Sequence, residues 1–181
     1  WLLEPELTAA RHLLLRDAVY ALRRQPACQT LMAELLSRPE TSVDSRILLL
    51  DVMIDSGFRE FPVIWQQQVH SNVVSSNIRV AGKSLIAMAS TNAGQFDDGL
   101  LKYVQDTTRP VSLRVQAASI LSRNRAALPE ATFELLRSQC SQDAAFETRL
   151  EAARAIGNLK LSFEELDSVI GIVAQAGPLE L

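Results

Sequence analysis

The stretch Val111–Asn124, VSLRVQAASILSRN, decides the fold class, because its side chains recur at the spacing of one amphipathic helix. The apolar side of that helix is formed by Leu113, Val115, Ala117, Ala118, Ile120 and Leu121. The polar side, at steps of three or four residues, is formed by Ser112, Gln116, Ser119 and Arg123. An arginine in the first turn, then two alanines, then Ile-Leu is the pattern to look for in the rest of the chain.

That pattern recurs along the chain at a nearly fixed interval. It is clear in TRLEAARAIG and looser in IRVAGKSLIA and SRILLLDVM. The marked arginines, Arg46, Arg79, Arg114 and Arg149, are spaced by 33, 35 and 35 residues. A period in the thirties with one marked helix per copy is typical of an array of helical repeats. The sequence therefore predicts an all-α fold in which neighbouring repeats bury one another's apolar faces.

Composition and charge narrow the range of functions. The chain has 181 residues, 48% hydrophobic and only 6% aromatic, and its 18 basic and 21 acidic side chains give a net charge of −3. Nucleic acid is therefore an unlikely partner, because binding phosphates needs a basic face. No apolar run approaches the roughly 18 residues of a membrane span. The chain starts at Trp1 and stops within an apolar phrase, so we expect it to be a piece of a longer polypeptide.

No sequence motif predicts a cofactor, a metal ion or a catalytic residue. The triplet Gly82-Lys83-Ser84 lacks the earlier glycine of a phosphate-binding loop, and His12 and His70 have no neighbouring ligand set. Cys28 and Cys140 are expected to be small buried side chains. Trp65, at helical spacing from Phe61 and Val69, is expected in the core.

The repeated pattern resembles that of HEAT repeats, which belong to the armadillo-type folds. The resemblance covers about residues 28–177 and is carried by Leu113-Arg114 with its alanines and Ile-Leu, and by Arg149 with Ala152-Ala153 and Ala155-Ile156-Gly157. It implies a right-handed α-α superhelix of helical hairpins, with the second helix of each hairpin on the concave side. Residues 1–181 would then be a single domain of about four full repeats and a partial one.

A narrower resemblance concerns the phrase LKLSFEELDSVIGIVAQAGPLEL at residues 159–181. It is similar to the HEAT region of large exported haem-c proteins of planctomycete-type bacteria, which join a sugar-dehydrogenase-like propeller, a helical repeat region and a cytochrome module. That resemblance implies an exported or periplasmic protein. The CxxCH motif that attaches haem is missing here, so this chain would be the middle region and would carry no haem itself.

Two sets of residues are candidates for structural or functional roles. The four arginines are expected to form a structural ladder, each reaching carbonyls or an acid, such as Asp106 or Asp143, in the turn of a neighbouring repeat. The concave side should offer an interaction face of mixed charge. We expect this face to include Asp44, Asp51, Asp55, Ser84, Met88, Gln116, Arg123, Glu151, Arg154 and Asn158.

The leading functional prediction is a non-catalytic scaffold whose concave face binds a protein, a peptide or flanking domains of the same chain. Two alternatives remain open. The chain could be a HEAT-like enzyme, such as a bilin lyase or an alkyl-base DNA glycosylase, although the acidic rung Asp44–Asp55 has no matching basic row in the sequence. It could also be a cytoplasmic adaptor that binds a single helix or peptide.

Overall fold

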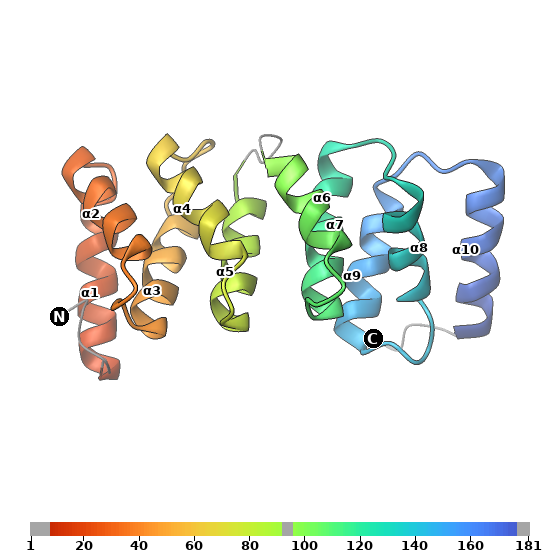
Figure 1. Ribbon diagram of the computed structural model, residues 1–181, viewed down its shortest axis with the longest axis horizontal. Helices are drawn as coiled ribbons and strands as arrows, with labels where there is room; N and C mark the ends of the chain where they lie inside the picture. Colours follow the sequence, from red (N-terminus) through yellow and green to blue (C-terminus); the bar gives the residue numbers. More distant parts are fainter. Residues whose placement is uncertain (1–7, 92–95, 177–181) are drawn as a thin grey trace. The chain divides into compact units, whose positions relative to one another are not determined.

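The computed structural model describes residues 8–91 and 96–176, and every regular element within those ranges is an α-helix (Figure 1). The all-α prediction is confirmed, whereas the right-handed superhelix stays a prediction. The chain divides into two compact units, Trp1–Asn92 and Ala93–Leu181.

The first unit consists of α1 (Ala9–Leu22), α2 (Pro26–Ser37), α3 (Val43–Ile54), α4 (Val63–Val73) and α5 (Ile78–Ala89). Its helices form two layers: α3 packs between α1 and α5, and α2 packs against α4. The layers are joined where α2 packs on α3 and α4 on α5, so that successive helices form hairpins (Figure 1).

The second unit consists of α6 (Asp97–Gln105), α7 (Val111–Asn124), α8 (Glu130–Ser138), α9 (Phe146–Gly157) and α10 (Phe163–Ala176). Here α7 packs against α9, and α6 contacts α8. The hairpins are α6 with α7 and α8 with α9. The helix α10 follows α9 and shares a cleft with α8.

The core of the first unit is built around Trp65 and the leucine run of α3. Leu48, Leu49 and Leu50 are all fully buried, because α3 is covered on two sides by α1 and α5 and on a third by α2. Trp65 is also fully buried, as expected, and its indole Nε1 donates a hydrogen bond to the carbonyl oxygen of Gln29 at 3.0 Å. This bond satisfies the polar atom of a side chain that otherwise contributes apolar surface.

The core of the second unit depends on small side chains. Ala117 and Ala118 of α7 and Ala152 and Ala155 of α9 are completely buried. Alanines at these positions allow the two helices to approach closely, and Leu121 fills the space beside them. The Ala-Ala pair of α7 is therefore a packing feature, whereas in α9 Ala152 is fully buried and Ala153 only half-buried.

Candidate functional site

A row of carboxylates lies along the exposed side of α3. Asp44, Asp51 and Asp55 follow one another at steps of seven and four residues, which places them on one side of a helix. The residues on the opposite side of the helix, such as Leu49 and Met53, are fully buried. The row of acidic residues Asp44, Asp51 and Asp55 expected from the sequence therefore lies at the surface of the first unit.

Each carboxylate of this row pairs with a base from a neighbouring helix. Arg16 of α1 approaches Asp55 at 2.7 Å, Lys83 of α5 approaches Asp51 at 2.8 Å, and Arg79 of α5 approaches Asp44 at 3.3 Å. The hydrogen bond from Arg16 to Asp55 raises the pKa of the Arg16 guanidinium. The basic partners come from α1 and α5, the helices on either side of α3. They do not form a row on a single helix, so the sequence did not reveal them.

We call this surface the α1–α3–α5 face, defined by Arg16, Asp44, Asp51, Asp55, Arg79 and Lys83. Its positive and negative charges balance, and Asp44 and Arg79 remain largely exposed while paired. Exposed ion pairs contribute little to stability, roughly 0–1 kcal/mol each. Such pairs can exchange partners with a ligand at small cost.

An open hollow of about 470 Å³ lies next to this ion-paired row. Ala9 and Leu13 of α1 and Ile47 of α3 supply its apolar lining, and His12, Asp44 and Arg79 supply polar groups. Leu13 is more than half exposed although it is a large apolar side chain. An apolar hollow with a few polar groups at its edge is the usual form of a small binding site.

Two residues expected on this face are buried instead. Ser84 and Met88 of α5 are 0% and 1% exposed, so neither can contact a partner at the surface. A sequence stripe with steps of three and four covers a broad sector of a helix, and here its inner edge turns into the core. The expected face therefore has to be drawn without Ser84 and Met88.

The corresponding residues of the second unit lie on α7 and α9. Arg123 and Arg154 are exposed, and Gln116 and Glu151 are half-buried. Asn158, the C-cap of α9, donates its side-chain amide to Ser122 Oγ at 3.3 Å. The candidate site is placed on the first unit, where the ion-paired row borders a hollow.

The repeated arginines have different surroundings. Arg46 donates to the carbonyl oxygens of Thr41 and Arg38 at 3.1 and 2.6 Å, and to Asn72 Oδ1 at 3.2 Å. Arg38 is the C-cap of α2, so the guanidinium lies where the helix dipole favours a cation. The carbonyls belong to the turn of its own hairpin, and only Asn72 belongs to the next one.

Arg114 repeats part of this arrangement in the second unit. Its Nε donates to the carbonyl oxygen of Val104, in the last turn of α6, at 2.7 Å. Asp106, which the sequence suggested as an arginine partner, accepts hydrogen bonds from Thr108 and Arg109, and those bonds lower the pKa of its carboxyl.

The other two arginines depart from the capping arrangement. Arg79 belongs to the ion-paired row described above. The guanidinium of Arg149 lies 5.9 Å from the Phe146 ring, and its buried Nε makes no hydrogen bond within the described part of the chain. Asp143, the second acid suggested as an arginine partner, is exposed.

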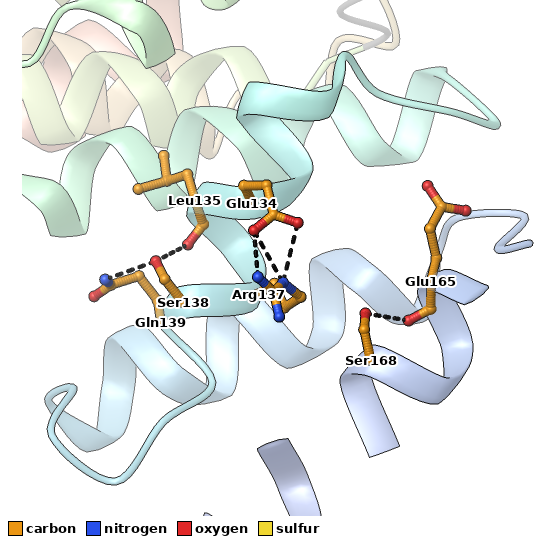
Figure 2. Close-up of polar contacts among 7 residues, drawn as sticks. All are labelled: Glu134, Leu135, Arg137, Ser138, Gln139, Glu165 and Ser168. Carbon is orange, nitrogen blue, oxygen red and sulfur yellow. Dashed lines mark hydrogen bonds and ion pairs between the residues drawn. The ribbon is translucent and has the colours of Figure 1, made fainter. Parts of the chain in front are cut away.

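A second cleft, of about 540 Å³, lies between α8 and α10. Four glutamates line it: Glu130, Glu134, Glu164 and Glu165. The other lining residues are Leu128, Phe133, Ser162 and Ser168. Figure 2 shows that Glu134 is engaged by Arg137 of the same helix and that Ser168 donates to the backbone carbonyl of Glu165. The hydrogen bond to Glu134 raises the pKa of the Arg137 guanidinium.

The remaining chemistry in the described residues is sparse. Burial raises the pKa of the Cys140 and Cys28 thiols, which disfavours the reactive thiolate. Within residues 8–91 and 96–176 there is no cluster of three metal-ligating side chains, and no helix there has the length and apolar character to cross a membrane.

A scan of the chain against protein-family models, a search of curated proteins and a search of solved structures each found no match.

Proposed function

We propose that this chain is a non-catalytic helical-repeat scaffold of the HEAT type, whose α1–α3–α5 face binds a short segment of a partner protein. The observation that carries the proposal is the hollow beside the ion-paired row. It combines the exposed Leu13 and the half-buried Ile47 with the exposed pair Asp44–Arg79.

The chemistry of the hollow suggests what the partner segment looks like. An apolar side chain would fill the space between Leu13 and Ile47. A basic residue of the partner beside it would pair with Asp44 and an acidic one with Arg79, replacing the present ion pair between these two side chains. Balanced charge on this face suits a protein segment better than a phosphate backbone, which requires a net positive surface.

A random peptide library displayed on phage tests this proposal. Peptides selected on the wild-type chain should share an apolar residue flanked by opposite charges. Their affinity should fall at least about tenfold on Leu13→Glu, which places a charge in the hollow. The matched control is Val63→Glu, the same kind of change at an exposed position of α4. Failure to enrich any peptide, or enriched peptides that bind Leu13→Glu as well as wild type, would contradict the proposal.

The wider part of the proposal is that the chain is a segment of a larger exported bacterial protein with haem-c and dehydrogenase-like modules. It is supported only by the resemblance of residues 159–181, of which 177–181 lie outside the described residues. Top-down mass spectrometry of the native polypeptide, combined with haem staining, tests it. A haem-free chain of 181 residues would contradict it.

A further inference from the structure

The helix α10 presents an apolar face that no other described helix covers. Phe163, Leu166 and Ile170 are 84%, 45% and 56% exposed, and Ala174 is exposed beside them. Their spacing of three, four and four residues places them in one stripe. A stripe of this size on a surface helix marks a contact site.

A second uncovered stripe lies on α1, on the side away from α3. Its large side chain is Leu14, which is 64% exposed. Small exposed residues surround it: Ala10, Ala18 and Ala21. Small residues around one leucine form a shallow surface against which a helix with larger side chains can pack closely.

The two helices match in length and in pairing. Both have 14 residues. The contacting hairpins of the described chain are α2 with α3, α4 with α5, α6 with α7 and α8 with α9, which leaves α1 and α10 outside any hairpin.

The two helices also match in charge. The acids Glu164, Glu165 and Asp167 lie in the N-terminal half of α10, which contains no basic residue. Residues 9–24, which span α1 and the turn after it, contain four arginines and a single acid, Asp17. Two of these arginines, Arg23 and Arg24, follow the C-terminal end of α1. Antiparallel packing would bring them to the acidic end of α10.

We propose that α10 of one copy packs antiparallel against α1 of a second copy, so that the chain associates head to tail through a hairpin shared between two molecules. Phe163 then lies near the C-terminal end of the partner's α1, and Ile170 packs against Leu14 of the second copy. Because the two contacting surfaces differ, the association is heterologous and can continue from copy to copy.

Sedimentation equilibrium of the 181-residue chain over a wide concentration range tests the association. We expect the average mass to rise with concentration beyond that of a dimer. Leu14→Glu and Ile170→Glu, both at exposed positions, should each raise the dissociation constant at least about tenfold. Val63→Glu serves again as the control and should associate like wild type.

Mixing the two defective variants separates this arrangement from a symmetric one. Leu14→Glu keeps an intact α10 and Ile170→Glu keeps an intact α1, so an equimolar mixture should form a dimer and nothing larger. A chain that stays monomeric, or a single variant that still self-associates as wild type does, would overturn the proposal. Either result is independent of peptide binding in the hollow.

A gain of affinity provides a second test, which addresses the proposed register. The antiparallel register brings Asp17 of one copy level with Asp167 of the other, which places two like charges in one contact. Asp17→Lys should therefore tighten the association severalfold. Unchanged or weaker association of a folded Asp17→Lys variant would contradict the proposed register.

Discussion

Arg46 shows how one side chain can connect three segments of the first unit. Its guanidinium donates to the carbonyl oxygen of Arg38, the C-cap of α2, and to that of Thr41 in the turn before α3. It also donates to Oδ1 of Asn72 of α4, which is itself buried. The Asn72 side chain also donates to the carbonyl oxygens of Gln68 and Leu36 at 2.9 and 3.4 Å. Removing the donor of such a hydrogen bond leaves a partly buried oxygen without a partner, which costs more free energy than the bond itself contributes to stability.

Replacing Arg46 should therefore destabilise the first unit. Arg46→Met keeps the aliphatic stem but removes the donor to the Thr41 carbonyl and to Asn72 Oδ1, and leaves the Arg38 carbonyl with only the Thr41 backbone N–H. We expect the free energy of unfolding to fall by about 1–3 kcal/mol. Urea unfolding followed by tryptophan fluorescence measures it, since Trp65 is fully buried in the core of the first unit.

The control is Arg79→Met, which removes an exposed ion pair with Asp44. Its effect should be below about 1 kcal/mol. Equal losses from both variants would show that Arg46 acts only as a surface charge.

Side chains at the N-cap decide where several of the helices begin. Ser42 caps α3, and its side chain accepts a hydrogen bond from Ser45 N at 3.2 Å. Asn77 caps α5, with Oδ1 accepting from Arg79 N and Val80 N. Ser162 and Glu165 form a capping box at the start of α10, since each side chain accepts from the other's backbone N–H.

The capping box should hold the first turn of α10. Ser162→Ala removes the acceptor for Glu165 N, at an expected cost of roughly 1 kcal/mol. Amide hydrogen exchange in residues 163–168 should then speed up about fivefold, if these amides exchange by local opening.

The matched control is Ser168→Ala in the same helix. Its hydroxyl donates back to the carbonyl oxygen of Glu165, a bond that contributes little to a helix (Figure 2). Exchange at the start of α10 should stay as in wild type. An equal acceleration in both variants would mean that the capping box is not what protects this turn.

At the scale of the molecule, the chain is two units with separate cores. The first is built from large aliphatics around Trp65, and the second from alanines between α7 and α9. Both units use two layers of helices, with contacts between helices two positions apart in the chain: α1 with α3, α2 with α4 and α3 with α5 in the first unit, and α6 with α8 and α7 with α9 in the second. Stability then comes from contacts between neighbouring helices.

A cavity in the first core should be costly. Leu49 is completely buried, and Leu49→Ala should lower the free energy of unfolding detected by tryptophan fluorescence by about 2–5 kcal/mol. Leu31 of α2 is half exposed, and Leu31→Ala should cost less than about 1 kcal/mol. Similar losses for the two would contradict the burial of α3 between its neighbours.

The sequence by itself determined the all-α class and the position of several helices, because periodicity and caps are local. The helix Val111–Asn124 begins and ends where its pattern predicts, and Trp65 lies in the core as its spacing predicts. Tertiary structure alone decided which helices became neighbours, since that depends on packing between residues more than 30 positions apart. It paired Asp44, Asp51 and Asp55 with bases of α1 and α5, opened the hollow beside Leu13, and buried Ser84 and Met88. The residues of α5 alone could not show that Ser84 and Met88 are buried, because the helices packed around α5 decide which part of its surface remains exposed.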